Sequence, residues 1–507
     1  YNATFILNAG QRPFAYTPPT GYVSLCTQNL PDPLIADSST AFDAKLYTGN
    51  GTSQTISGYN FSPDFAWFKS RNGTDWHALV DTVRGNTKVL FSNSSNGEET
   101  RTEGVSSFNS DGFSLGDYAP MNKNNDSLVA WAWDAGSSNT SISAGSLNSS
   151  AYNTSRTWSD GIANSNSDFD QAKTNAFNGD RSNKLRTGGN SVLVTLNFSP
   201  ALTVSSTIEI LAENWPTSNH RYTVTVDGTT TTKDVTGSPA TFNVSGSLTQ
   251  ITVDNNSSGG RTYLEWIKVD GKELIDSNVT PPNVPSIAST VRANPSAGFS
   301  IVSWTGNGTS GATLGHELNA APKMVIFKNR DTANTNWRVY NTMVDGSLDW
   351  VYLNTTAAKS DSSLSLPTST VFTAGGSNDT NGNGNAMIAY CFSPVEGYSS
   401  FGSYEGNGSD NGSYVFLGFR PAFLMIKRTD AVKGWMMIDS TRNPSNVIKG
   451  TLYPNLSDAE YTGSGHEVDF LSNGFKCRKN NDRHNASGGT YLYVAFAENP
   501  FKYSRAR

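Results

Sequence analysis

The side chains that most often carry catalysis or bind metals are sparse in this chain of 507 residues. It has 5 histidines and 3 cysteines, and their spacing fits neither a zinc site nor a disulfide framework. His466-Glu467 lacks the second histidine that a zinc-binding helix requires. There is no Gly-x-Ser-x-Gly elbow, phosphate-binding loop or dinucleotide fingerprint. The sequence therefore gives no signature of an enzyme.

One segment has the beginning of a calcium-binding loop. Asp379-Thr-Asn-Gly-Asn-Gly384 follows the Asp-x-Asn-x-Asn-Gly pattern of an EF-type loop. The twelfth position of such a loop needs a bidentate glutamate, and this chain has Tyr390 there. We therefore interpret the segment as an Asn/Gly turn between two strands. A carboxylate pair among the 43 acidic residues could hydrolyse glycans, but no local pattern identifies one.

Composition excludes several kinds of partner. A formal net charge of −6 leaves no basic stripe for nucleic acid phosphates. No run of about 18 apolar residues is present, so we expect no insertion into a membrane. The chain starts at Tyr1 without a signal peptide, which suggests processing or a longer parent chain. Abundant Thr, Asn, Gly and aromatic residues favour short strands joined by tight turns.

Three copies of one unit of roughly a hundred residues account for much of the chain. Each copy has a Gly-Asn-Gly turn, a proline, an apolar strand ending in lysine, a tryptophan, and an aromatic closing strand. The apolar strands are Phe65-Ala-Trp-Phe-Lys69, Met324-Val-Ile-Phe-Lys328 and Phe423-Leu-Met-Ile-Lys427. Such ordered landmarks predict one fold repeated at 40–136, 298–397 and 398–507. We expect the strand-end lysines to be solvated or paired with a nearby acid.

The repeated tryptophans are the aromatic residues most open to a functional interpretation. We align Trp76, Trp337 and Trp435 as one column, which follows the strand-entry prolines by 13, 15 and 14 residues. A repeated column favours an anchor in the core of each module. The alternative is a platform for sugars, because an aromatic face suits the apolar face of a pyranose.

A different unit lies between the first and second copies, at 157–280. Its segments alternate apolar and polar residues, as in Tyr222-Thr-Val-Thr-Val226, and Asp227-Gly228 fits a two-residue hairpin turn. A Ser/Asn/Thr/Gly tract at 137–156 and a Pro-rich stretch at 281–297 are predicted linkers. The predicted fold class is all-β, with several antiparallel β-sandwich (jelly-roll-like) domains in series.

Three segments of the unit at 157–280 carry a family resemblance: Trp158-Ser-Asp-Gly161, Ala176-Phe-Asn-Gly-Asp180 and Trp266-Ile-Lys-Val-Asp-Gly-Lys272. Together they resemble galactose-binding-like (discoidin-type) β-sandwiches. In that family the turn at the second segment often lies beside a structural Ca²⁺. The resemblance therefore implies Asn178 and Asp180 as metal ligands, although asparagine stands where aspartate is commoner. Trp215 lies on a loop of this unit and, with His220 and Arg221, is our candidate for ligand binding.

The first residues carry a second resemblance. Gly10-Gln-Arg-Pro-Phe-Ala-Tyr-Thr-Pro-Pro-Thr-Gly-Tyr22 and Leu25-Cys-Thr-Gln-Asn-Leu-Pro31 are similar to the last strands of SPRY-type sandwiches in phage tail-fibre proteins. Residues 1–39 are therefore expected to be the C-terminal remnant of such a domain. The threefold repeat also resembles a module of unassigned function in virion proteins of marine phages, including cyanophages.

These resemblances imply a non-catalytic virion appendage, a tail fibre or similar protein, located at the virion surface or extracellularly. It would attach to host surface polysaccharide or lipopolysaccharide and contact other virion proteins. A homo-oligomer, as a trimer, is implied by analogy with fibres alone. Two alternatives remain open: a purely structural or decorating virion or filament-forming surface protein, and a polysaccharide depolymerase.

Overall fold

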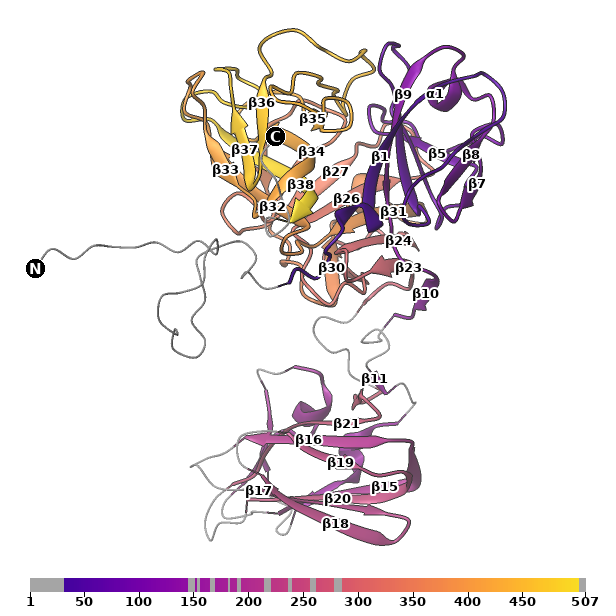
Figure 1. The fold of residues 1–507 in the computed structure, drawn as a ribbon. Coiled ribbons are helices and arrows are strands. Elements are labelled where there is room, and N and C mark those ends of the chain that lie inside the picture. Colours follow the sequence, from indigo (N-terminus) through magenta and orange to yellow (C-terminus); the bar gives the residue numbers. More distant parts are fainter. Residues whose placement is uncertain are drawn as a thin grey trace, which may run out of the picture. The chain divides into compact units, whose positions relative to one another are not determined.

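The computed structural model describes residues 32–144, 151–152, 156–164, 169–180, 183–188, 193–213, 220–235, 239–255, 261–277 and 285–500. It is built almost wholly of strands in several antiparallel β-sandwiches, which confirms the predicted fold class. The chain divides into two compact units (Figure 1). Unit 1 is Tyr1–Ser141 with Ile287–Arg507, and unit 2 is Ile142–Ser286. Most of the predicted SPRY-like remnant, residues 1–31, lies outside the described residues.

Unit 1 contains the three repeats, which we name module 1 (40–136), module 2 (298–397) and module 3 (398–507). Module 1 packs a six-stranded sheet, β1-β9-β3-β4-β5-β6, against a three-stranded sheet, β2-β8-β7. Phe68, Val80 and Phe113 lie in the apolar layer between these sheets. Its elements are η2 Ser38–Thr40, β1 Phe42–Thr48, β2 Gln54–Ile56, β3 Phe65–Ser70, β4 Ala78–Asp81, β5 Lys88–Phe91, β6 Glu99–Thr100, β7 Val105–Asn109, β8 Gly112–Leu115, α1 Ala119–Asn122 and β9 Ser127–Trp133.

Modules 2 and 3 repeat this plan of two packed sheets. The second sheet of module 2 has two strands instead of three, and the first sheet of module 3 has four strands instead of six. The elements of module 2 are β24 Phe299–Thr305, β25 Ala312–Gly315, β26 Met324–Asn329, β27 Arg338–Asn341, β28 Asp349–Tyr352, β29 Ser360–Asp361, β30 Val371–Ala374, α2 Asn378–Asn381 and β31 Ala386–Phe392. Those of module 3 are β32 Ser399–Glu405, β33 Tyr414–Phe416, β34 Phe419–Arg428, β35 Met436–Asp439, β36 Val468–Leu471, β37 Gly474–Cys477 and β38 Thr490–Pro500. The second sheets are β25-β30 in module 2 and β33-β37-β36 in module 3.

The Gly-Asn-Gly turns have the same local structure in all three modules. Their second glycines, at 51, 308 and 408, have φ angles of 65°, 70° and 65°, a conformation that glycine adopts without a steric cost. A buried asparagine anchors each turn by exchanging side-chain and backbone hydrogen bonds with the turn asparagine. The three pairs are Asn122 with Asn50, Asn381 with Asn307, and Asn485 with Asn407. The repeated turn signal therefore has a structural cause.

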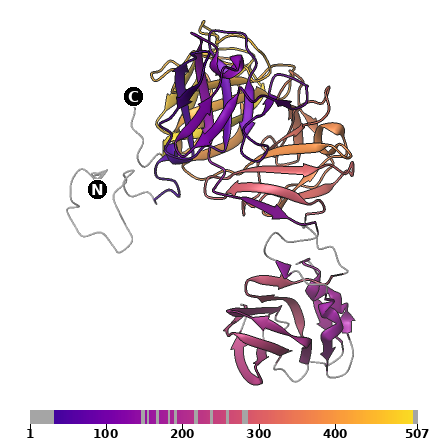
Figure 2. The same ribbon diagram turned by 90° about the vertical axis from the view of Figure 1, so that its right-hand side faces the viewer.

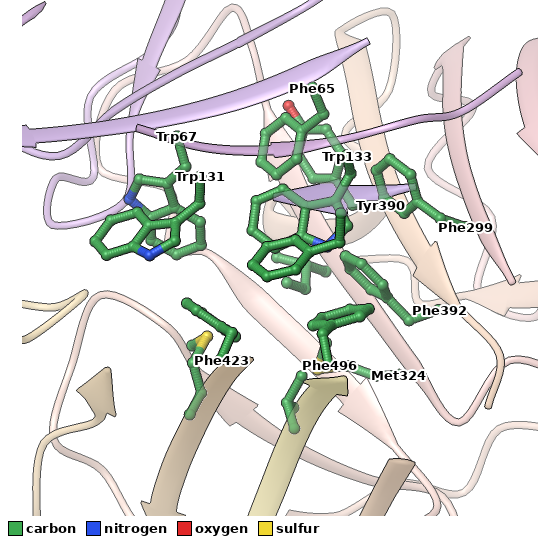
Figure 3. Packing of buried hydrophobic residues seen from close by; sticks show 14 of the residues in the cluster. Phe65, Trp67, Trp131, Trp133, Phe299, Met324, Tyr390, Phe392, Phe423 and Phe496 are labelled. Atoms are coloured by element: carbon green, nitrogen blue, oxygen red, sulfur yellow. The ribbon is translucent and has the colours of Figure 1, made fainter. Parts of the chain in front are cut away.

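The larger sheets of the three modules meet in one shared core (Figure 3). Side chains alternate along each central strand, so that Ala66 and Phe68 of β3 face their own module while Phe65 and Trp67 face the shared core. Modules 2 and 3 contribute the corresponding residues Met324, Ile326, Phe423 and Met425. Burial on both faces explains why these strands are continuous apolar runs rather than alternating ones.

The three modules are joined head to tail in a closed ring (Figures 1 and 2). The backbone N–H of Glu98 in module 1 donates to Arg330 of module 2, at 2.6 Å. The backbone N–H of Lys359 in module 2 donates to the backbone carbonyl of Thr429 in module 3, at 2.8 Å. The backbone N–H of Glu460 in module 3 donates to the backbone carbonyl of Arg71 in module 1, at 2.7 Å, and this contact closes the ring of modules. The same contact made three times gives unit 1 an internal threefold pseudosymmetry.

The strand-end lysines differ from the expectation that they are solvated or paired with an acid. Lys69, Lys328 and Lys427 are fully buried. Their Nζ atoms donate to backbone carbonyls: Lys328 to Ser95 across the module boundary at 3.2 Å, and Lys427 to Thr356 likewise at 3.2 Å. Burial lowers the pKa of each of the three to about 8. The ring formed by the modules covers positions that would be at the surface of a single sandwich.

Unit 2 is a sandwich with its own core, in which one sheet has the order β12-β15-β20-β17-β18. The predicted hairpin at Asp227-Gly228 is confirmed, with φ angles of 49° and 75°. The elements of unit 2 are β11 Ala151–Tyr152, η3 Trp158–Gly161, β12 Ile162–Asn164, β13 Phe169–Gln171, η4 Lys173–Phe177, β14 Leu185–Thr187, β15 Leu193–Val204, β16 Thr207–Glu213, β17 His220–Val226, β18 Thr229–Val235, β19 Ala240–Asn243, β20 Gly246–Asp254, β21 Tyr263–Val269 and β22 Lys272–Leu274.

The segments that we predicted as linkers contain strands. β10 (Asn139–Ile142) lies within 137–156 and β23 (Ser289–Asn294) within 281–297, and the two are neighbours at the edge of the large sheet of module 2. β10 is the edge strand and three of its four residues are exposed, which fits its polar sequence, whereas β23 lies between β10 and β24 and is buried or half-buried throughout. Across the described residues, no helix has the length and apolar character needed to cross a membrane.

Candidate functional site

The ligand-binding residues predicted in unit 2 do not form a common surface in the described structure. Trp215 lies outside the described residues. His220 is fully buried in β17, and burial lowers its pKa, against an opposing effect of Asp254. Arg221 is exposed and pairs with Asp234 at 3.0 Å. Because successive residues of a strand point to opposite faces, His220 and Arg221 cannot contact one ligand from the same side.

The predicted calcium ligands lie at the end of η4. The Oδ1 of Asn178 accepts the backbone N–H of Asp180 at 2.8 Å, and Asp180 Oδ2 accepts Asn183 Nδ2 at 2.7 Å. Both side chains therefore stabilise the turn itself. Within the part of the chain that the structure describes, no group of three or more His, Cys, Asp or Glu side chains is arranged for a metal ion. The calcium site stays a prediction.

The tryptophan column of the repeat contains one misaligned member. Trp337 and Trp435 are fully buried, which confirms a core role for both. Their backbone N–H groups donate to the side-chain Oδ1 of Asn354 and of Asn455, respectively. In module 1 the equivalent hydrogen bond, to Asn93 Oδ1, is donated by the backbone N–H of His77 and not by that of Trp76. His77, Trp337 and Trp435 also each immediately precede the strands β4, β27 and β35. The alignment of Trp76 with this column was wrong by one residue.

In module 1 the imidazole of His77 stands at the position that the indoles of Trp337 and Trp435 have in modules 2 and 3. The Nε1–H of Trp337 donates to the Phe91 carbonyl at 2.8 Å, and that of Trp435 donates to the Tyr352 carbonyl at 2.8 Å. His77 accepts the Trp67 Nε1–H on its Nδ1 at 3.0 Å. Burial lowers the pKa of His77 well below its usual range, so the ring is neutral.

Because of that one-residue offset, Trp76 lies outside the buried column. Its side chain is 39 % exposed, the most of any tryptophan among the described residues. The corresponding residues of the other modules are Asn336 and Gly434, neither of which is aromatic. A repeat position that is aromatic in one copy alone, and exposed there, is not explained by the fold that the copies share.

Trp76 lines a surface cleft of about 310 Å³ in module 1. The loop between β3 and β4 supplies Thr74, Asp75 and Trp76, and Phe91 at the end of β5 contacts the indole edge-on, with ring centroids 5.1 Å apart. The opposite wall is formed by Glu99 of β6, Arg101, and the segment that opens α1, Tyr118 and Pro120. The cleft is therefore formed by three segments of module 1: the loop between β3 and β4, the region of β6, and the start of α1.

Pro120 explains why this cleft is open in module 1. The anchoring asparagines define equivalent positions, and two residues before them stand Pro120, Asp379 and Arg483. In module 2, Asp379 accepts the backbone N–H of Asn336 at 2.8 Å. In module 3 the Arg483 guanidinium lies over the Tyr453 ring at 5.0 Å. Longer polar side chains thus occupy the corresponding space in modules 2 and 3, whereas proline leaves it empty.

The polar groups of the cleft are held in fixed positions. Arg101 donates from Nε and Nη2 to Glu99 Oε2, at 3.0 and 2.6 Å, and its guanidinium lies 5.1 Å from the centre of the Tyr118 ring. The ion pair with Glu99 raises the pKa of Arg101, and partial burial raises the pKa of Tyr118. Lys123 pairs with Asp75 at 3.2 Å. These contacts fix the donors and acceptors around the indole.

The cleft combines an exposed aromatic face with preoriented acceptors and donors. This is the arrangement that suits a polyhydroxylated ring, whose C–H face stacks on the indole while its hydroxyls meet the carboxylates and the guanidinium. The lining has no histidine or cysteine, and its two carboxylates are each paired with a cation. The described lining thus offers a stacking face and hydrogen-bonding groups to a ligand.

Sequence reasoning missed this site although a signal for it exists. His77, Trp337 and Trp435 all stand four residues before the last residue of the next strand, namely Asp81, Asn341 and Asp439, whereas Trp76 stands five before it. Aligning the strand ends rather than the tryptophans would have placed Trp76 outside the core column.

Comparisons with known proteins bear on the family and leave the activity open. Among curated proteins no match was found. A solved structure of the arabinofuranosyltransferase AftD from mycobacteria aligns with 71 % of this chain and 35 % of that chain, at 10 % identity and a TM-score of 0.17. A likeness this weak supports no statement about fold or function. The sequence matches the family described as "Domain of unknown function (DUF7483)" over residues 37–162 and 167–500, through both units, and the chain belongs to that family.

Proposed function

We propose that this chain is a non-catalytic glycan-binding protein of a virion-surface or other extracellular appendage, and that it binds through the Trp76 cleft. One observation carries the proposal: a tryptophan left 39 % exposed beside a cleft, at a repeat position where the other modules have no aromatic residue. Solvent exposure of an indole has an energetic cost that folding does not recover, and a stacked sugar recovers it.

Two further considerations support this reading. The fixed ion pairs around the indole give a ligand preoriented partners, which lowers the entropy lost on binding. The place of the protein in an appendage, with host polysaccharide or lipopolysaccharide and other virion proteins as partners, is supported by the resemblance of the repeat and of the N-terminal residues to phage virion proteins. Trp215 remains a predicted second contact in unit 2.

The test is a binding screen of the full chain against arrayed bacterial surface polysaccharides and lipopolysaccharides, followed by calorimetric titration of the ligands found. Trp76→Ala is expected to weaken binding by at least about tenfold, the equivalent of roughly 1.4 kcal/mol of lost stacking. Phe416→Ala is the matched control, because this ring of module 3 is 62 % exposed and lies in a different module. Its binding is expected to equal that of the unmodified protein.

Other outcomes would assign the chain differently. The absence of binding to every glycan would favour a purely structural or decorating role. Shortening of a bound polysaccharide, lost on replacement of Asp75 or Glu99 by the amide, would establish a depolymerase. Equal loss of binding in both aromatic variants would place the binding site elsewhere.

A further inference from the structure

We infer that the Trp76 cleft selects uncharged glycans and rejects anionic ones such as uronic acid, sialylated or sulfated sugars. This inference rests on the proposed function and adds the chemical class of the ligand. It follows from how the charges of the cleft are arranged, which is independent of the exposure of the indole.

The lining carries two carboxylates, Asp75 and Glu99, against one guanidinium, Arg101. An anionic sugar would need Arg101 as its partner, because arginine is the side chain that best recognises carboxylate and sulfate groups. Arg101 already donates two hydrogen bonds to Glu99, at 2.6 and 3.0 Å, and lies 3.7 Å from Glu103. The one cation of the lining is therefore claimed by two carboxylates of the protein.

The nearest other cations are also engaged. Lys123 pairs with Asp75 at 3.2 Å and with Asp126 at 3.7 Å. Lys69 is fully buried and donates to the carbonyls of Ser70 and Gly73. The charge of Lys123 is thus already balanced by two carboxylates and Lys69 is buried, so an anion in the cleft would compete with Asp75 and Asp126 for Lys123.

A ligand anion would thus meet Asp75 and Glu99 as like charges and would have to compete with them for Arg101 and Lys123. Juxtaposed like charges are an effective way of excluding a wrong ligand. A neutral sugar avoids this cost, since its hydroxyls donate to the unused lone pairs of the carboxylates and leave both ion pairs intact. An ionised carboxylate offers about four acceptor sites, and the hydrogen bonds from Arg101 and Lys123 use two on Glu99 and one on Asp75. The hydroxyl of a neutral sugar fits those sites, and a charged group does not.

The experiment compares, on the full chain, matched glycan pairs of the same backbone and linkage that differ mainly in charge, such as a methyl-esterified galacturonan with its free acid and a neutral oligosaccharide with its sulfated form. We expect measurable binding to the neutral member of each pair and binding at least about tenfold weaker to the anionic one. Affinity for the neutral member should change little as salt is raised, since no net charge is neutralised on binding.

Glu99→Gln tests the cause of the selectivity. The amide removes one like charge and releases Arg101, so the preference for neutral over anionic glycans is expected to fall by about two- to fivefold, the range of a partly exposed ion pair. Asp410→Asn is the matched control, because it removes an acid from another exposed pair, with Lys479 at 2.7 Å, in module 3. This control should keep the preference.

The outcomes separate this inference from the proposed function. Binding of anionic glycans at least as tight as that of neutral ones, and lost in Trp76→Ala, would overturn the charge selectivity while supporting the binding site. Binding of neutral glycans that Trp76→Ala leaves unchanged would overturn the site itself. A Glu99→Gln variant with unaltered preference would contradict the assigned role of Glu99.

Discussion

A shift of one residue decides what the aromatic side chains of the repeat do. His77 stands where modules 2 and 3 have a buried tryptophan, and Trp76 beside it points to solvent. A one-residue slip reverses the side to which a residue points, so adjacent residues have opposite fates. Tryptophan is therefore a buried anchor at this position in modules 2 and 3, whereas module 1 has histidine there and an exposed tryptophan one residue earlier.

The two kinds of tryptophan are expected to differ in their contribution to stability. Trp337→Ala should lower the free energy of unfolding by about 3–5 kcal/mol, because it opens a cavity in the shared core. Trp76→Ala should lower it by less than about 1 kcal/mol, as for other surface changes. Urea denaturation of the two variants measures both values. Similar losses in the two variants would contradict the assignment of Trp76 to the surface.

At the scale of elements, the connections between strands join the modules. β6 and the residues before it reach from module 1 to the end of β26 in module 2, where Arg330 makes a two-pronged ion pair with Glu98, with both distances 2.9 Å. The pair is largely buried, at 16 % and 9 % side-chain exposure. Burial raises the pKa of Glu98, but Arg330 and Arg84 together outweigh burial and hold it below the ordinary value of 4.5.

Arg330→Met is expected to destabilise unit 1 by about 1–3 kcal/mol at neutral pH, the range of a hydrogen bond to a charged group. A carboxyl group with a lowered pKa contributes stability above its ordinary pKa and loses it as the pH falls through its folded pKa. The difference between the variant and the unmodified protein should therefore shrink below about pH 4. Urea unfolding at several pH values measures it. Lys479→Met, in an exposed pair, should change stability by less than about 1 kcal/mol at any pH.

At the scale of the whole molecule, unit 1 closes on itself although unit 2 interrupts its sequence. The shared core draws residues from before and after unit 2, and module 3 bonds to module 1 through Arg71 and Glu460, at 2.7 Å. The chain leaves module 1 through β10 and returns through β23, which are adjacent strands of one sheet. The two ends of the insertion are therefore close together, as in domain insertions that leave the host fold intact.

Replacing residues 143–286 by a short Gly/Ser linker is expected to leave unit 1 folded. Among the residues that the structure describes, the shared core and the cores of modules 1 and 3 contain no residue of 143–286, so unit 1 is expected to keep its stabilising apolar contacts. Scanning calorimetry of the shortened chain should show the unfolding transition of unit 1 at nearly the temperature found in the full chain. A shortened chain without a cooperative transition would show that unit 2 is needed for the ring of modules.

The sequence by itself determined the all-β fold, the three copies, their turns and their central strands. These depend on local chemistry: glycines that adopt positive φ, prolines that precede β3 and β26, and apolar runs such as Phe65-Ala-Trp-Phe-Lys69. The third proline, Pro421, lies within β34 instead, where the pairing with β38 shifts register. The tertiary structure alone decided that the modules share a core, that the strand-end lysines are buried, and that Trp76 faces a cleft. The shared core and the burial of the lysines depend on which surface the next module covers, through contacts between residues hundreds of positions apart, such as Trp131 and Asp439. The Trp76 cleft depends instead on three segments that meet within module 1. No local pattern records such contacts: the spacing to the strand ends separates Trp76 from the core column, but the cleft beside it exists only because Glu99, Arg101 and Tyr118 come near it in the folded chain.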